Sequence, residues 1–194
     1  MSIKTGWIEI LYNVATGSRK VRSFFTPVGA AFFGLLIFSF VVTALRVDRL
    51  LGLTSIIPGP LNIILCLPVF SIALILVGWS VLNFIRARGT PVPFNPPPRL
   101  VTTGPYAYTR NPMLTGVFAL LFGFGFLFGS FSLLVIFTPL FILLNVWELK
   151  AIEEPELIKR LGEGYVDYRK RTPMFFPGLG KIFERKTKGS GSAD

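Results

Sequence analysis

The sequence predicts an all-α integral membrane protein, built as a helical bundle of four or five transmembrane helices. Hydrophobic residues make up 52% of the chain and charged residues 15%, whereas about a quarter of the residues in soluble proteins are charged. Three stretches carry no charge at all: residues 23–45, 50–85 and 111–147. Each is at least as long as the ~20 apolar residues that a membrane-spanning helix needs.

The first elements along the chain are a short surface helix and one spanning helix. Within residues 1–14, Trp7, Ile8, Leu11 and Tyr12 lie near helical spacing, which indicates a helix that rests at the membrane surface. The uncharged stretch that follows has the length of a single span.

The middle uncharged stretch, residues 50–85, allows two interpretations. The Pro-Gly-Pro sequence that starts at Pro58 favours a break, which would leave residues 61–85 as one long tilted helix. Alternatively, the stretch folds back near Pro68 and adds a fifth span.

Residues 111–147 are predicted to form a helical hairpin. Unbroken, this run would make a helix of about 55 Å, far longer than a bilayer is thick. The sequence FGSFS at residues 128–132 is the one plausible turn inside the run, so we expect the tip there. Each arm of this tight hairpin would be barely long enough to span.

The distribution of basic residues predicts which side faces the cytosol. With four spans, all but two of the 20 Lys and Arg residues fall on one side, the exceptions being Arg46 and Arg49. Because basic loops stay in the cytosol, that side carries the loop after the second span, the mouth of the hairpin and the C-terminal segment. A fifth span would change the side of the N-terminus and leave these three in the cytosol.

Two segments outside the spans complete the predicted bundle. Residues 88–105 include TPVPFNPPPRL and should run extended along the membrane surface, because proline excludes regular helix. The segment EEPELIKRLGEGYVDYRKR predicts an amphipathic helix at the cytosolic face, with Leu157, Leu161, Tyr165 and Tyr168 on one stripe.

Three polar features converge on the predicted mouth of the hairpin. They are GPYAYTRNP at its start, Glu153-Glu154 at its end, and the Tyr- and Arg-rich helix that ends in RTPMFFP. Because a hairpin returns to where it began, Arg110 and Glu153 should lie in one small region. Each feature also has a plain structural interpretation: Asn111-Pro112 is a good helix start, and the two glutamates could simply pair with Arg110.

The composition argues against several kinds of site. The chain has no histidine and one cysteine, Cys66, which disfavours a metal centre and leaves no disulfide framework. A net charge of +10 would suit nucleic acid, but no basic stripe interleaves with exposed aromatic residues. We therefore expect neither a metal nor a nucleic-acid partner.

The C-terminal half carries a family resemblance. GPYAYTRNP, an apolar hairpin, then EE and LGEGYVDYRKRTPMFFP together resemble the isoprenylcysteine carboxyl methyltransferase family, over roughly residues 97–177. The chain looks like a compact prokaryotic member, of the archaeal kind. Where the family pattern reads Arg-His-Pro-x-Tyr, this chain reads Arg-Asn-Pro-Met-Leu from Arg110 to Leu114, so the histidine and the second tyrosine are missing.

The resemblance implies S-adenosylmethionine as the cofactor. The cofactor site that it implies, together with the aromatic and acidic residues beside it, consists of Leu100, Val101, Tyr106, Tyr108, Asn111, Pro112, Met113, Leu114, Glu153, Glu154 and Tyr165. Tyrosine faces would stabilise the cationic sulfur, and Glu153 would accept hydrogen bonds from the ammonium or ribose. Backbone N–H groups at the start of the hairpin would receive the cofactor carboxylate.

The implied reaction is O-methylation of the carboxylate of a lipidated, prenylcysteine-like acceptor. We expect catalytic roles for Arg110, Glu153, Arg169 and Arg171, because an arginine can hold a carboxylate through two hydrogen bonds. The expected partners are the bilayer and a lipophilic small molecule or prenylated peptide. The active site and C-terminus of this multi-pass protein would face the cytosol.

On this interpretation the chain divides into three parts. Residues 1–95 hold the surface helix and the first transmembrane helices. Residues 96–188 hold the cofactor-binding loop, the hairpin and the amphipathic helix, and residues 189–194 form a flexible tail.

Three other interpretations stay open. A phospholipid N-methyltransferase would methylate an amine, and Glu153, Glu154 or a tyrosine would have to remove its proton. A membrane sterol reductase would bind a nicotinamide dinucleotide, although this chain has too few spans and no Gly-rich phosphate loop. The last is a non-enzymatic lipid-binding membrane protein.

Overall fold

The protein is an all-helical bundle in a computed structural model that describes residues 3–53, 55, 57–90, 96–97 and 99–176. No strand occurs in that part of the chain. In order, the helices are α1 (Ile3–Thr16), α2 (Arg19–Leu50), α3 (Gly59–Arg86), η1 (Gly104–Ala107), α4 (Pro112–Phe128), η2 (Leu133–Phe137), α5 (Thr138–Glu148), η3 (Leu149–Glu153), α6 (Glu154–Leu161) and α7 (Glu163–Arg171).

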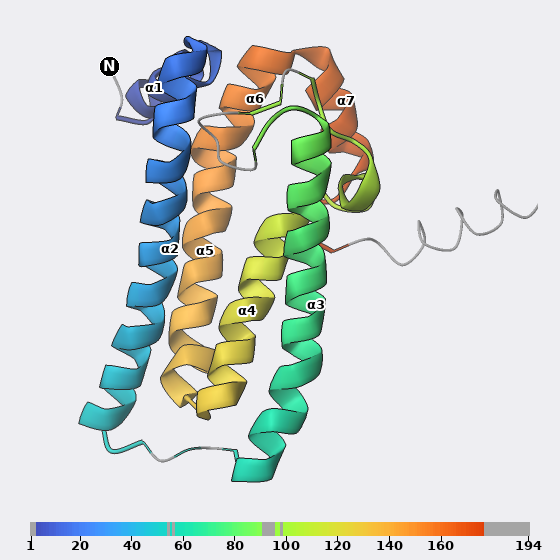
Figure 1. The fold of residues 1–194 in the computed structure, drawn as a ribbon. Helices are drawn as coiled ribbons and strands as arrows, with labels where there is room; N and C mark the ends of the chain where they lie inside the picture. Colours follow the sequence, from blue (N-terminus) through green and yellow to red (C-terminus); the bar gives the residue numbers. More distant parts are fainter. Residues whose placement is uncertain (1–2, 54, 56, 91–95, 98, 177–194) are drawn as a thin grey trace, which may run out of the picture.

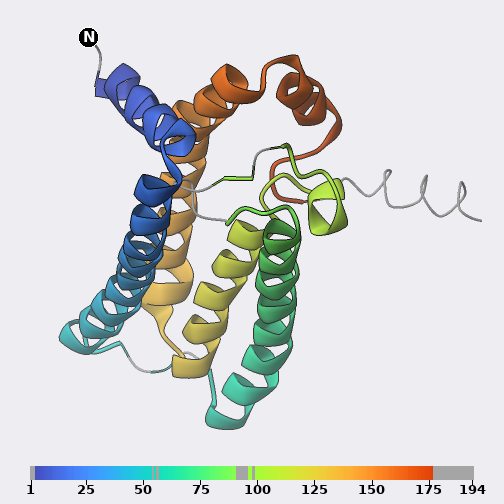
Figure 2. The ribbon, with the colours of Figure 1, turned by 45° about the horizontal axis from the view of Figure 1, so that its top comes forward.

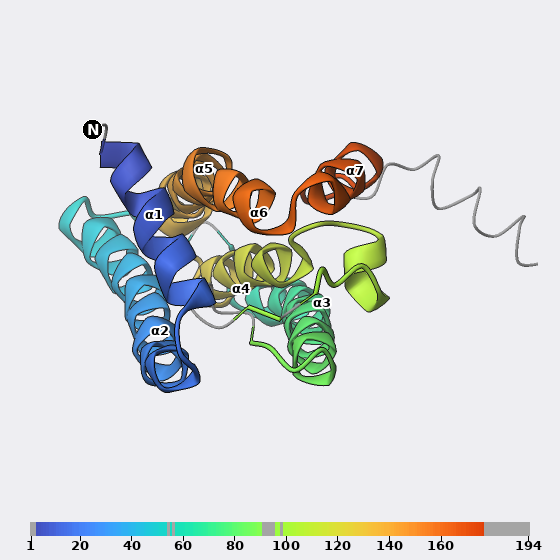
Figure 3. The same ribbon diagram turned by 90° about the horizontal axis from the view of Figure 1, so that it is seen from above.

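The long helices run side by side, and the polar elements gather at one end (Figure 1). We call this the polar end; it carries α1, η1, α6 and α7. The view from that end shows α1 lying across the end of α2, and α7 to the side of the bundle beyond α6 (Figure 3). Helix α1 therefore lies at the same end of the bundle as α6 and α7.

Among the described residues, three helices are long and apolar enough to cross a membrane: Arg22–Leu50, Gly59–Arg86 and Leu133–Leu161, while Pro112–Phe128 is shorter. The middle stretch is one helix, so the alternative fold-back near Pro68 is wrong. Pro68 lies inside α3, whereas Pro58 is its N-cap and Pro60 falls in its first turn. A proline inside a membrane helix is tolerated when the neighbouring groups satisfy the backbone.

The α4–α5 hairpin turns at the predicted place. Helix α4 ends at Phe128, and Gly129 follows with φ +59°, donating its N–H to the carbonyls of Gly125 and Phe126. Glycine adopts this left-handed conformation at little cost, which makes it a common helix stop. The second arm begins at Phe131.

The second arm contains two π-helical turns, η2 and η3, which make it wider than an α-helix at two points. The N–H of Thr138 bonds to the carbonyl of Leu133, and the N–H of Glu154 to that of Leu149, each five residues back. A proline lies directly after both bonds, at position 139 and at position 155. The wider turn relieves the clash between a proline ring and the carbonyl four residues earlier.

The bundle packs through small residues and aromatic rings. Helices α3 and α4 lie against each other (Figure 2), and a Cβ on Gly116 would come within 2.8 Å of Val77 Cγ2 and 3.0 Å of the Ala73 carbonyl oxygen. Phe141, 1% exposed, forms an edge-to-face contact with Phe40, centroids 5.2 Å apart. Small residues let helices approach closely where lipid supplies no hydrophobic drive.

The surface segments depart from the prediction at one point. The amphipathic stripe is not on a single helix, because Gly162, with φ +61°, separates α6 from α7 and redirects the chain. Residues 96–97 and 99–103 contain no helix, as the prolines predict. Residues 91–95 and 98 of that loop, Pro177 and the predicted flexible tail 189–194 lie outside the described residues.

At the end of the bundle opposite the polar end, a buried carboxylate joins α2 to the tip of the hairpin. Asp48 of α2 accepts a hydrogen bond from the Ser130 hydroxyl and another from the Ser132 backbone N–H, the second over 2.9 Å. The Ser130 hydroxyl oxygen also accepts from the N–H of Leu133 at 3.1 Å. Asp48 and Ser130 therefore cap the start of the second arm, satisfying N–H groups that a helix leaves open.

Replacing Asp48 with alanine is expected to destabilise the bundle. The change leaves the Ser130 hydroxyl and the Ser132 N–H without their buried acceptor, which costs at least about 2 kcal/mol and lowers Tm by roughly 4–8 °C for a chain of this size. Thermal unfolding of the purified protein in detergent measures the shift. Asp167→Asn, a change at an exposed acid, is the control; equal Tm values for the two variants would contradict the capping role.

Candidate functional site

A cavity opens at the polar end, between the hairpin mouth, the loop that precedes it and the C-terminal helices. Its volume is about 120 Å³, smaller than the roughly 300–1,000 Å³ of typical ligand pockets, and it is partly open to solvent. The described residues that line it are Leu11, Phe84, Thr90, Pro96, Pro97, Arg99, Leu100, Val101, Tyr106, Arg110, Asn111, Leu149, Glu153, Glu154, Glu156, Leu157, Arg160, Leu161, Tyr165 and Tyr168.

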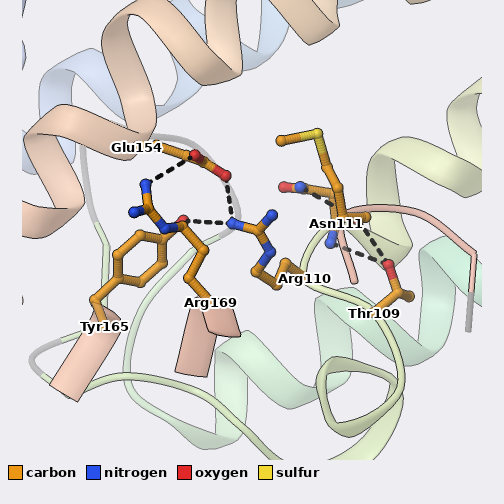
Figure 4. A network of polar contacts seen from close by, with 7 residues as sticks. Thr109, Arg110, Asn111, Glu154, Tyr165 and Arg169 are labelled. Carbon is orange, nitrogen blue, oxygen red and sulfur yellow. Dashed lines mark hydrogen bonds and ion pairs between the residues drawn. The ribbon is translucent and has the colours of Figure 1, made fainter. Parts of the chain in front are cut away.

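An ion pair between Arg110 and Glu154 joins the two ends of the hairpin inside this cavity. Both side chains are 11% exposed. Arg169 approaches the other carboxylate oxygen of Glu154 at 3.5 Å, and Arg110 Nη1 lies 3.5 Å from the Tyr165 hydroxyl (Figure 4). The Nε atom of Arg110 is buried and has no hydrogen-bond partner among the described residues. One donor of this guanidinium is therefore left for a ligand.

Three buried tyrosines contribute to the cavity wall. Tyr168 donates its hydroxyl to the Tyr106 carbonyl over 2.6 Å, and the Tyr106 ring meets Phe84 edge to face at 5.1 Å. Burial, with the nearby Glu154 carboxylate, raises the pKa of Tyr165 to about 12. Burial also raises the pKa of Tyr106 and of Tyr168. All three phenols are therefore neutral at physiological pH and act as ring surfaces and hydrogen-bonding groups.

The three glutamates of the cavity differ in what they contact. Glu154 pairs with Arg110, and Glu156 accepts from Arg160 Nε at 2.7 Å. The half-buried carboxylate of Glu153 makes no hydrogen bond or ion pair within the described part of the chain. Because a buried carboxylate is costly unless it is paired, Glu153 is the acid that a cationic or hydrogen-bonding ligand would satisfy.

The C-terminal segment holds the start of α4 in place through hydrogen bonds. The N–H of Arg110 donates to the Pro173 carbonyl at 2.9 Å, and that of Asn111 to the Met174 carbonyl at 3.1 Å. The Thr109 hydroxyl donates to the same Met174 carbonyl at 2.7 Å (Figure 4). Of the backbone N–H groups at the start of the hairpin, which were predicted to receive the cofactor carboxylate, those of Arg110 and Asn111 are thus already bonded.

The structure places most of the predicted site residues on the cavity. Leu100, Val101, Tyr106, Arg110, Asn111, Glu153, Glu154 and Tyr165 line it. Pro112, Met113 and Leu114 occupy the first turn of α4 without lining the cavity, and Tyr108 is exposed. Arg169 reaches the cavity only through Glu154, and Arg171 is exposed, donating to the Asp167 carbonyl at 3.2 Å.

Sequence reasoning missed the Glu156–Arg160 pair. The side chains are 7% and 13% exposed and both line the cavity. Their i, i+4 spacing was visible in the sequence, but that pattern is ordinary on exposed helix faces. In the part of the chain that the structure describes, no group of three or more His, Cys, Asp or Glu residues could hold a metal ion.

Comparisons with known proteins show which family this chain resembles in sequence. The family model described as phospholipid methyltransferase matches residues 61–164, which include α3, the hairpin and α6. The nickel-cobalt-cadmium resistance protein NccN of Alcaligenes xylosoxydans xylosoxydans is 36% identical over 80 residues, 41% of this chain and 37% of that protein. The protein-S-isoprenylcysteine O-methyltransferase of Schizosaccharomyces pombe is 34% identical over 82 residues, 40% of this chain and 33% of that protein.

These matches cover the elements that build the cavity. The chain spans about a third of the length of these two curated relatives, and no solved structure matches it. The family match extends over more than half of the chain, from the first turn of α3 to the second residue of α7. The chain therefore belongs to the phospholipid methyltransferase family of membrane methyltransferases.

Proposed function

We propose that this protein transfers a methyl group from S-adenosylmethionine to the carboxylate of a lipidated, prenylcysteine-like acceptor. The observation that carries the proposal is the Glu153 carboxyl group, which has no hydrogen-bond or ion-pair partner among the described residues and lines a cavity together with three buried tyrosines and Arg110, whose Nε is also without a partner. Methyltransferases of this family generally use this cofactor. When bound, it supplies a methyl group carried on a positively charged sulfur.

The residues of the cavity suit such a cofactor. Glu153 would accept hydrogen bonds from its ammonium group or ribose hydroxyls, and Arg110 Nε would donate to its carboxylate. The rings of Tyr106 and Tyr165 offer negative faces to a cation, an interaction of about 0.5–2 kcal/mol for each ring. Leu100 and Val101, on the opposite loop, add apolar contact.

A carboxylate acceptor is consistent with the scarcity of general bases in this chain. Such an acceptor is already ionised at neutral pH, so that no group has to remove a proton from it. The chain has no histidine, and Tyr165, whose pKa is about 12, is a poor base at pH 7. The main tasks left to the protein are to orient two ligands and to exclude water, which can lower a barrier by several kcal/mol.

The acceptor would reach the site from the inner leaflet. Basic side chains are exposed around the polar end, among them Arg88, Lys150 and Lys170, while Arg46 and Arg49 lie near the opposite end of α2. Since basic residues mark the cytosolic side, the proposal puts the cavity at the cytosolic face. Its apolar wall would then be continuous with the lipid.

A phospholipid amine is the second candidate acceptor, favoured by the family description itself. An amine must lose a proton before it attacks. Glu153 is the cavity carboxylate with no ion-pair partner in the described residues, and it would have to serve as the base. A nicotinamide-dependent reductase, or a lipid-binding protein without activity, would bind no S-adenosylmethionine.

Replacing Glu153 with glutamine should weaken binding of S-adenosylmethionine by at least about tenfold, because a charge-assisted hydrogen bond becomes a neutral one. Equilibrium binding of the labelled cofactor to protein in lipid nanodiscs gives the affinity. Glu163→Gln removes an exposed carboxylate on the neighbouring helix and should leave the affinity unchanged. Undiminished affinity in Glu153→Gln would contradict the assigned cofactor site.

Wild-type protein given a prenylcysteine and phosphatidylethanolamine side by side should methylate the prenylcysteine. Transfer of a radiolabelled methyl group, with products separated into esters and amines, measures both reactions at once. The ester should dominate at neutral pH, because its acceptor needs no base. A product labelled mainly on nitrogen would replace the proposed acceptor by the phospholipid.

A further inference from the structure

The cavity contains a second buried guanidinium whose donors are largely unused. Arg160 Nε donates to Glu156 Oε1 at 2.7 Å, which fixes the plane of the group. Its two terminal amino groups make no hydrogen bond within the described part of the chain. The side chain is only 13% exposed and lines the cavity. A buried arginine held by one edge presents its other donors to a ligand.

The surroundings of Arg160 differ from those of Arg110. On α6, Leu157 and Leu161 line the cavity on either side of Arg160, and Leu11 of α1 lines it as well. Helix α1 is fixed on α6 by Lys159, which pairs with Glu9 Oε1 at 2.6 Å and lies 4.2 Å above the Tyr12 ring. This part of the cavity therefore combines an apolar wall with one buried cation, which suits an apolar molecule that carries an anionic group.

The other arginines are less suited to bind such an anion. Arg110 uses its terminal Nη1 for Glu154 and the Tyr165 hydroxyl. Arg160, in contrast, uses only Nε for Glu156 and keeps both terminal amino groups for a ligand. Arg169 and Arg171 do not line the cavity, and Arg99 is exposed at its edge. Arg160 is the buried cavity arginine that lies among leucines.

We propose that Arg160, oriented by Glu156, binds the anionic group of the methyl acceptor, while Leu11, Leu157 and Leu161 contact its apolar chain. The proposal rests on the proposed function, since it divides that one cavity into two subsites. Glu153 lies seven residues before Arg160 on the same helical arm, and the charge of Arg160 acts on the Glu153 carboxyl group. The two subsites would therefore adjoin, with the cationic end of one ligand at Glu153 and the anionic end of the other at Arg160.

The test compares acceptor binding with cofactor binding in three variants. Arg160→Gln removes the charge, Arg160→Lys keeps it without the two-pronged donor, and Lys170→Gln removes a charge from an exposed position. Protein in nanodiscs is titrated with N-acetyl-S-farnesylcysteine, with the matching farnesylcysteine amide, and separately with S-adenosylmethionine. The amide has the same chain and lacks only the negative charge.

Wild-type protein and Lys170→Gln should bind the acid at least about tenfold more tightly than the amide. Arg160→Gln should lose this preference, Arg160→Lys should keep part of it, and the affinity for S-adenosylmethionine should stay within about twofold in all three. Thermal unfolding identifies any variant that is misfolded. If Arg160→Gln is misfolded, two other variants test the subsite: Arg160→Lys should keep part of the preference for the acid, and Leu157→Ala should weaken binding of the acid and the amide equally.

Three outcomes would overturn the assignment: wild-type protein that does not prefer the acid, folded variants that keep the full preference, or an Arg160 variant that loses cofactor affinity instead. Failure of the proposed function would give a different experimental result. In that case wild-type protein does not bind S-adenosylmethionine, or transfers no methyl group to the acid, whatever its preference between acid and amide. Loss of the acid preference in Arg160→Gln supports the anion subsite even then.

Discussion

The ion pair between Arg110 and Glu154 is the interaction on which the rest of the polar end depends. Charged groups are costly in hydrocarbon, so a chain that crosses the membrane repeatedly must collect them where its segments end. The hairpin brings the loop before α4 and the helix after α5 to the same place, and the pair fixes them there. Each partner is nearly buried, so removing Glu154 leaves the Arg110 charge uncompensated, and removing Arg110 leaves Glu154 with only the longer contact to Arg169.

At the end of the bundle opposite the polar end, a smaller set of hydrogen bonds likewise holds two segments of the chain together. Asp48 caps the second arm together with Ser130 and so ties α2 to the hairpin tip. Between the two ends the helices adhere through close packing, with Gly116 against α3. A bundle fixed at both ends can keep one cavity in shape although lipid surrounds most of its surface. The cavity therefore needs no soluble domain to hold it.

The sequence was enough to predict the elements whose cause is local. Charge-free length located the spans, and a glycine–serine turn located the hairpin tip. Pro68 was ambiguous because a proline that ends a helix in water is tolerated inside a membrane helix. The helix break at Gly162 was not predicted because the apolar stripe on its two sides keeps a helical period. Likewise, no local pattern reveals that residues 173 and 174 bond to the start of α4.

The orientation of the cavity glutamates follows from a proline and the turn before it. In the π-helical turn η3 the N–H of Glu154 bonds five residues back, to Leu149, just before Pro155. One extra residue in a turn rotates everything after it by about 100°. Without η3, the side chains of α6 would point in other directions, and Glu154 would turn away from Arg110. In the sequence this extra residue is visible only as a proline after two glutamates. Its effect is to determine that Glu154 and Glu156 pair with arginines and that Glu153 remains for a ligand.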